Sequence, residues 1–219
     1  MNDQKPLVLD MDIPGVKPAD QQRSKLLQRK FVVAGRSVLR HTRLIDLPIP
    51  ALAKEAGSSV GGFYSRFESK EAFFEFMRMQ MLQEHLEMFQ DHLNASKFDG
   101  KSHLDISTAF VDFMITVFSG PWRGVLREAY SQIGDRPDAW EPMKKRGQFW
   151  RAQITEMTLP LVKNTEGLEE RVSVAVQLLF SALNNEMMNP NLVFRIDDPK
   201  FRFYLISTFD SLIAGENRP

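Results

Sequence analysis

Apolar residues recur three and four positions apart along most of the chain, which is the period of an α-helix with one buried face. Residues 103–119 are apolar nearly all round, as expected of a buried central helix. The pattern therefore predicts an all-α fold. The predicted helices span 21–43, 49–56 and 60–67, then a long segment that Ser69 caps and that ends before a loop at 94–102, and then 103–119, 122–133, 137–162, 168–188 and 199–214.

Two short helices joined by a tight turn follow the first long helix. Residues 49–56 carry apolar side chains at i, i+3 and i+4, and Gly57 follows, where helices commonly end in a left-handed conformation. Ser58 or Ser59 can cap the second short helix, at 60–67, by accepting a hydrogen bond from its free N–H groups. This pattern is typical of a helix-turn-helix, whose second helix lies in the major groove of DNA.

The residues of this turn resemble a known signature. Residues 53–72 read A-x-x-A-G-x-S-x-G-x-F-Y-x-x-F-x-S-K-E-A, which is similar to the DNA-binding signature of the TetR family of transcriptional regulators. The resemblance implies an N-terminal three-helix helix-turn-helix DNA-binding domain at 21–75 and a C-terminal helical ligand-binding and dimerisation domain at 76–219. Residues 1–20 contain three prolines and show no helical period, which predicts a flexible arm.

The distribution of charge supports a DNA-binding role more than its total does. The net charge is zero, but residues 21–45 contain seven Lys or Arg and no Asp or Glu. A protein that neutralises phosphates needs local positive charge rather than global charge. A solvated helix face is the alternative interpretation, and the neighbouring helix-turn-helix makes it the less favoured one.

The resemblance also implies which residues touch DNA. Tyr64 matches the phosphate-contacting tyrosine of the family, with a half-buried core tyrosine as the alternative. Lys70 stands at the start of the fourth helix, where its ammonium can face a phosphate. Arg66 is the candidate for a bidentate base contact, with a phosphate or a nearby acid as its alternative partner. The expected DNA-binding residues are Ser59, Val60, Gly61, Gly62, Tyr64, Ser65, Arg66 and Lys70.

Two of these residues are glycines inside a predicted helix, each of which costs roughly 1 kcal/mol relative to Ala. Close approach of the backbone to DNA would offset that cost, and close packing against the preceding helix is the alternative. The N–H of Gly62 could still donate to a phosphate.

Members of this family place an effector pocket among the helices of the C-terminal part. That part of the chain is rich in aromatic and Met side chains, which suit an apolar, flat or flexible ligand. Ordinary core packing is the alternative for most of them. Arg127, Gln132, Gln153, Asn184 and Asn185 could orient a ligand, but no pattern singles one out. The expected ligand-binding residues are Met114, Phe118, Trp122, Tyr130, Phe149, Trp150 and Phe180.

Residues 168–214 contain two apolar helices that need a partner. They pack within their own chain, or they pair with a second copy as a four-helix bundle, as the family resemblance implies. Two-fold symmetry favours the second arrangement because it matches palindromic operators. The expected partners are therefore a double-stranded DNA operator, a small-molecule effector and a second copy of the chain.

Other function classes receive little support. The chain has no Cys, which excludes a disulfide scaffold and thiolate chemistry. His85 and His92 are seven residues apart rather than at the i, i+4 spacing of zinc sites on one helix, so we expect neither a metal nor a cofactor. No signal peptide and no run of 18 apolar residues is apparent, which predicts a cytoplasmic protein without a membrane partner.

The predicted function is a ligand-responsive, sequence-specific transcriptional regulator, most often a repressor in this family, that leaves a palindromic operator when an apolar or aromatic effector binds. A helical ligand-binding adaptor that has lost DNA binding is the alternative. An all-α enzyme is a weaker alternative, because no Gly-rich phosphate loop, nucleophile elbow or paired-carboxylate motif is present in the sequence.

Overall fold

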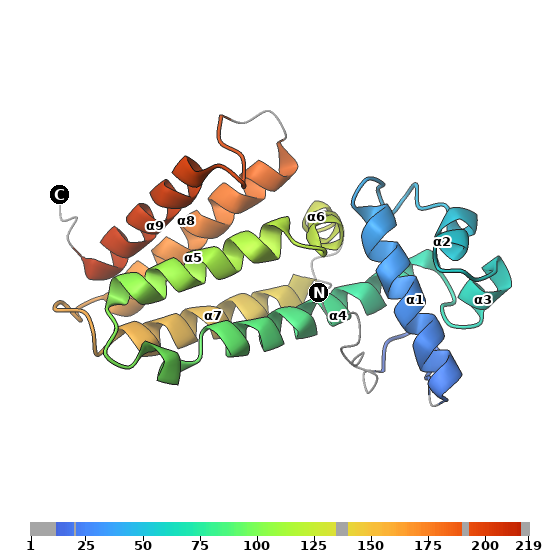
Figure 1. Ribbon diagram of the computed structural model, residues 1–219, viewed down its shortest axis with the longest axis horizontal. Helices are drawn as coiled ribbons and strands as arrows, with labels where there is room; N and C mark the ends of the chain where they lie inside the picture. The colour runs from blue at the N-terminus through green and yellow to red at the C-terminus, as the bar shows by residue number, and fades with distance from the viewer. Residues whose placement is uncertain (1–11, 20, 135–139, 190–192, 216–219) are drawn as a thin grey trace. The chain divides into compact units, whose positions relative to one another are not determined.

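The computed structural model describes residues 12–19, 21–134, 140–189 and 193–215 (Figure 1). These residues form α-helices, one short 3-10 helix and one isolated β-bridge, so the predicted all-α fold is confirmed. Contacts divide the chain into two compact units. Unit 1 comprises the chain up to Glu84 together with residues 121–132, and unit 2 comprises the remainder.

Unit 1 is built around a cluster of four phenylalanines. The ring of Phe63 lies 5.3 to 5.5 Å, centre to centre, from the rings of Phe31, Phe67 and Phe73, and all four side chains are fully buried. Such edge-to-face pairs add about 0.5–1.5 kcal/mol each beyond simple burial. The helices of this unit are α1 (Gln22–Leu39), α2 (Ile49–Glu55), α3 (Val60–Tyr64), the first part of α4 (Lys70–His92), and α6 (Arg123–Ser131).

Close packing of α1 against α4 holds this unit together. A Cβ added at Gly35 of α1 would lie 2.5 Å from the Sδ of Met77 and 2.6 Å from the Cζ of Phe73, both on α4. Only a glycine therefore lets the two helices approach this closely. At the start of α4, the Ser69 hydroxyl accepts a hydrogen bond from the Ala72 N–H at 3.0 Å, which is the cap that the sequence predicts.

The sequence predicts a flexible N-terminal arm, but residues 12–19 are held against the end of the helix-turn-helix. Val16 forms an antiparallel bridge with Phe67, and the N–H of Glu68 donates to the carbonyl of Gly15 at 2.8 Å. Gly15 has a φ of +77°, a conformation that L side chains rarely adopt. This segment is therefore part of unit 1, while the rest of the predicted arm lies outside the described residues.

The boundary between the units lies inside α4, with residues up to 84 in unit 1 and residues from 85 onward in unit 2. The helix α6 belongs to unit 1, although the residues before and after it in the chain belong to unit 2. The sequence places this helix in the C-terminal domain instead, because local periodicity does not show what a helix packs against. The chain thus passes from one unit to the other three times.

Unit 2 is a group of long helices with α5 in contact with α7, α8 and α9 (Figure 1). The bounds of α5, α8 and α9 agree with the prediction to the residue, whereas α1, α3 and α7 are shorter than predicted. No helix of the described residues is both long enough and apolar enough to cross a membrane. The elements of this unit are the end of α4, the 3-10 helix η1 (Ala95–Phe98), α5 (His103–Ser119), α7 (Glu141–Thr158), α8 (Leu168–Met188) and α9 (Pro199–Ala214).

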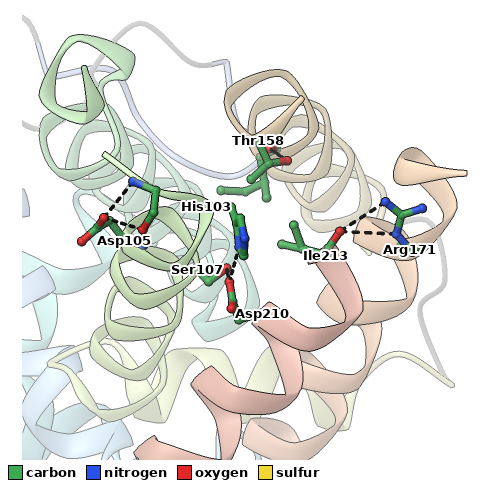
Figure 2. Close-up of polar contacts among 9 residues, drawn as sticks. His103, Asp105, Ser107, Thr158, Arg171, Asp210 and Ile213 are labelled. Atoms are coloured by element: carbon green, nitrogen blue, oxygen red, sulfur yellow. Dashed lines mark hydrogen bonds and ion pairs between the residues drawn. The ribbon is translucent and has the colours of Figure 1, made fainter. Parts of the chain in front are cut away.

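Polar contacts fasten α9 to its neighbours (Figure 2). The carboxylate of Asp210 on α9 accepts a hydrogen bond from the Ser107 hydroxyl at 2.9 Å and lies 2.8 Å from the Nδ1 of His103, both on α5. The guanidinium of Arg171 on α8 donates to the carbonyl of Ile213 on α9 at 3.2 Å. These contacts fix the order of the three helices within unit 2.

Candidate nucleic-acid interface

Local hydrogen bonds define both ends of α3. Gly57 ends the preceding turn with a φ of +61°, as predicted. Ser59, rather than Ser58, caps α3 by accepting a hydrogen bond from the Gly62 N–H at 3.0 Å. The Ser65 hydroxyl then donates to the Gly62 carbonyl at 2.7 Å. The N–H of Gly62 is therefore already paired, so it is not the free phosphate donor that the sequence suggests.

The two glycines of α3 have different surroundings. A Cβ at Gly62 would overlap the hydroxyl of Ser58, whereas a Cβ at Gly61 would meet only the Ser59 hydroxyl at 3.8 Å. The crowding at Gly62 comes from one hydroxyl that can rotate away, so packing explains this glycine only in part. Gly61 is exposed and not crowded, and the approach of DNA to either glycine stays a prediction.

One side of α3 faces away from the phenylalanine core. Val60 is 39% exposed and Tyr64 is 47% exposed, and one turn of helix separates them. The ring of Tyr64 packs at right angles on Phe63, with 5.2 Å between ring centres. Five predicted DNA-binding residues share this exposed side, namely Ser59, Val60, Gly61, Tyr64 and Ser65.

Two cations border this exposed face, and carbonyl groups hold both of them. Arg66 donates to the carbonyl of Ser65 at 2.8 Å and to that of Pro18 at 3.2 Å. The ammonium of Lys70 donates to the carbonyl of Ile45, in the loop before α2, at 2.6 Å. Carbonyl oxygens orient these side chains without cancelling their charge. Arg66 therefore binds neither of the neighbouring acids that the sequence offers as alternative partners.

The basic residues near α1 divide into two groups. Arg36 lies 3.8 Å from the carboxylate of Glu84, and Arg43 donates to the buried carboxylate of Glu128 at 2.9 Å. These two arginines therefore pair with acidic side chains of unit 1. The other five, Arg23, Lys25, Arg29, Lys30 and Arg40, form no ion pair within the described part of the chain. The positive charge available to a phosphate is thus smaller than the sequence suggests, but it remains.

Comparison with known families decides what this region is. Residues 45–77, which include α2, α3 and the beginning of α4, match the family model described as bacterial regulatory proteins, tetR family. This match identifies residues 45–77 as a DNA-binding region of the TetR type. No curated protein sequence matches it.

Within the unit that carries this TetR-type region, α6 is held against the carboxyl end of α1. A Cβ at Gly124 would overlap the backbone of Leu39 and lie 2.6 Å from the N of Arg40. The guanidinium of Arg127 donates to the carbonyl of Leu39 at 3.0 Å and to that of Thr42 at 3.2 Å. It thereby satisfies carbonyl groups that the last turn of a helix leaves free. The sequence offers Arg127 only as a ligand-orienting or enzymatic residue, and the Gly inside this short helix was the one signal of close packing.

Two of the predicted ligand-binding residues belong to unit 1. The indole N–H of Trp122 donates to the carboxylate of Glu84 at 2.6 Å, and its ring lies under the guanidinium of Arg36. Tyr130 is on α6, and burial raises the pKa of its phenol above the ordinary value. Both residues therefore lie in unit 1, and their ligand-binding role stays a prediction.

The other five predicted ligand-binding residues lie in unit 2, and four of them belong to a cluster of aromatic rings that includes Trp150. The Trp150 ring lies nearly parallel to Phe89 and to Phe180, at 6.3 and 6.0 Å, while Phe113 meets it edge-on at 5.3 Å. Met114, on α5 in the same unit, is fully buried. The aromatic cluster, as named below, comprises Phe89, Phe113, Phe118, Phe149, Trp150 and Phe180.

Proposed function

We propose that this TetR-family regulator is a homodimeric repressor that binds a palindromic operator and that a small aromatic effector releases it. The observation that carries the proposal is the exposed side of α3, with its small, apolar and hydroxyl-bearing residues bordered by Arg66 and Lys70. A helix of this kind, held from behind by a rigid aromatic core, can enter a major groove without rearranging.

Each residue of this face suits a particular contact with DNA. Tyr64 and Lys70 would bind phosphate oxygens, which sets the position of the protein on the duplex. Val60 would contact a thymine methyl, and Arg66 would exchange its two carbonyl partners for the O6 and N7 of a guanine. The proposed operator half-site therefore contains at least one guanine and one thymine.

Exposed apolar side chains on α8 and α9 support a dimer. Leu178 is 48% exposed and lies one turn after the exposed Val174 on α8, while Phe203 and Tyr204 on α9 are 64% and 54% exposed. Large apolar side chains grouped on neighbouring helices usually mark an interface. A second copy related by a two-fold axis would cover them and present two copies of α3 to a palindrome.

The route of the chain suggests how an effector acts on DNA binding. The helix α4 belongs to both units, and α6 belongs to unit 1 while its flanking segments belong to unit 2. A ligand that shifts α4 or α6 would displace α1, because Gly35 and Gly124 hold α1 against both helices without space to spare. A coupling of about 1–3 kcal/mol would change operator affinity 5–150-fold, and DNA would weaken effector binding by the same factor.

The test is selection of random duplex DNA by the purified protein at two salt concentrations. Enrichment of a palindrome that is lost at high salt would support the proposal, because phosphate contacts release counterions. Binding that is indifferent to sequence, or no binding, would contradict it and favour the adaptor.

The dimer has a separate test in analytical ultracentrifugation. Leu178→Glu together with Phe203→Glu places charges on the exposed apolar side chains and should give monomers. Gln148→Glu adds a charge at an exposed position of α7 and should leave the dimer intact. Dimers that persist in the double variant would show that the interface lies elsewhere.

A further inference from the structure

The indole N–H of Trp150 is an unpaired donor inside unit 2. The residue is 4% exposed, and its Nε1 has no hydrogen-bond partner among the described residues. Its neighbours are the rings of Phe89, Phe113 and Phe180, none of which offers an acceptor oxygen. A buried donor left unpaired costs about 1–3 kcal/mol, so it calls for a partner that the chain itself does not supply.

A second unpaired polar atom lies on α8, one turn beyond the phenylalanine that stacks on Trp150. The Oδ1 of Asn184 on α8 is buried and has no partner among the described residues. Asn184 stands one turn after Phe180, the residue whose ring stacks on Trp150. Among the described residues, α7 thus carries one unused buried donor and α8 one unused buried acceptor.

Arg146, on α7, is a third polar residue near this cluster, and it forms no ion pair among the described residues. Arg146 stands one turn before Trp150 on α7, and its guanidinium lies 6.0 Å from the ring centre of Phe149. Within the described part of the chain Arg146 forms no ion pair. Burial lowers the pKa of its guanidinium below the ordinary value, which shows that its surroundings disfavour an isolated positive charge. An anion would relieve that cost.

The edge of the aromatic cluster on α7 and α8 is partly exposed. Phe149 and Phe180 are half-buried, whereas Phe89 and Phe113 are buried. A Cβ added at Gly147, between Arg146 and Trp150 in the sequence, would meet no other atom within 4 Å. A flat molecule can therefore approach this edge without displacing the centre of the cluster.

We infer that the effector is an aromatic carboxylic acid bearing a hydroxyl or amino group, with its carboxylate bound by Arg146 and Trp150. Its ring packs on Phe149 and Phe180, and its hydroxyl or amino group donates to Asn184. This inference rests on the proposed function, since it specifies the effector of the same regulator. It differs from the prediction of an apolar effector by requiring a negative charge.

The test compares matched acids and neutral esters. Hydroxy-substituted benzoic, cinnamic and naphthoic acids, and the methyl ester of each, are titrated into the full-length protein by isothermal calorimetry. At least one acid should bind about tenfold more tightly than its ester, because a charge-assisted hydrogen bond is stronger than a neutral one. If no acid binds, or if every ester binds as well as its acid, the inference is overturned.

Three variants and one control test which residues produce the preference for acid over ester. Arg146→Gln should abolish the preference for acid over ester, and Arg146→Lys should restore part of it. Arg151→Gln removes an equal charge from the same helix and should leave the preference unchanged. Trp150→Phe keeps a ring in the cluster but removes the N–H, so it should weaken the acid severalfold. Circular dichroism confirms that each variant is folded, and a preference that survives Arg146→Gln overturns the inference.

Operator release separates this inference from the proposed function. Fluorescence anisotropy with the selected operator should show release by the same acids that bind. If an acid binds through Arg146 but releases no DNA, the acid site stands and its role as the effector site fails. If only neutral compounds release the operator, the repressor stands and the inference about an acid fails.

Discussion

The exposed side of α3 and the aromatic cluster of unit 2 differ in whether their polar groups are hydrogen-bonded. Around α3, Ser59, Ser65 and Lys70 each have a partner within unit 1. In unit 2, the Trp150 indole N–H and the Asn184 Oδ1 have no hydrogen-bond partner among the described residues. A surface that meets its ligand in water can exchange one hydrogen bond for another at little net cost. A buried group has no water to exchange, so the proposed ligand would gain the full benefit of pairing with it.

Among the variants below, a substitution in the core behind α3 should lower stability the most. Phe63→Ala removes the central ring of the phenylalanine core and should lower the free energy of unfolding by about 3–5 kcal/mol. Urea unfolding followed by circular dichroism measures the loss. Phe149→Ala, in the half-buried edge of the aromatic cluster, is the matched control and should cost clearly less. Equal losses would show that the two regions are equally rigid.

Gly124→Ala should have the next largest effect. The added methyl overlaps the backbone of Leu39, which cannot move without displacing α1, so we expect a loss of about 1–3 kcal/mol in unfolding free energy. Gly147→Ala adds the same methyl where no atom lies within 4 Å and should be neutral or stabilising by up to about 1 kcal/mol. Urea midpoints of the two variants give the comparison, and similar midpoints would argue against a rigid junction between α6 and α1.

The proposed phosphate contacts of α3 and α4 can be tested by removing two of them together. Tyr64→Phe combined with Lys70→Ala should weaken binding by about tenfold, or about 1.4 kcal/mol, at every DNA sequence. The salt dependence should also fall by about one unit of slope, since one phosphate-bound cation is lost. Anisotropy titrations at several salt concentrations measure both quantities. Unchanged affinity and slope would remove these two residues from the DNA contacts.

The smallest expected effect concerns the start of α5. The side chain and backbone N–H of Ser102 both donate to the Asp105 carboxylate, and these bonds lower the pKa of that carboxyl below its ordinary value of 3.8. A depressed pKa means that its stabilisation is present above pH 3.8 and is lost as the pH falls through the lower, folded-state pKa.

Asp105→Asn should therefore lower the urea midpoint slightly near neutral pH. The difference from the unsubstituted protein should shrink as the pH falls below 3.8, where the native carboxyl also becomes neutral. A difference that stays constant over this range would mean that the charge of Asp105 contributes nothing to the cap.

Local patterns predicted much of the fold because the forces involved act over a few residues. The bounds of α5, α8 and α9 follow from caps and from stripes of apolar residues, and the structure reproduces them. The turn at Gly57 and the cap at Ser59 follow from the same short-range chemistry. The family signature lies within the same stretch, so both the helix-turn-helix and the family were recognisable before any contact was known.

Residue assignments that depend on distant packing were less predictable. Trp122 and Tyr130 look like ligand-binding residues by composition, yet they belong to unit 1 because α6 packs there. Residues 12–19 look flexible by composition, yet a bridge to Phe67 holds them. No local pattern distinguishes an aromatic residue that fills a core from one that meets a ligand.

The sequence by itself determined the helices, the turn before α3 and the family, since propensity, capping and a short signature act between residues that are neighbours in the chain. Only the tertiary structure decided that α6 joins unit 1, and that the Trp150 N–H and the Asn184 Oδ1 find no hydrogen-bond partner among the described residues. Gly124 meets Leu39 across more than 80 positions, and whether a polar atom is paired depends on every segment folded around it. Such facts arise from burial and packing, which no stretch of sequence contains alone.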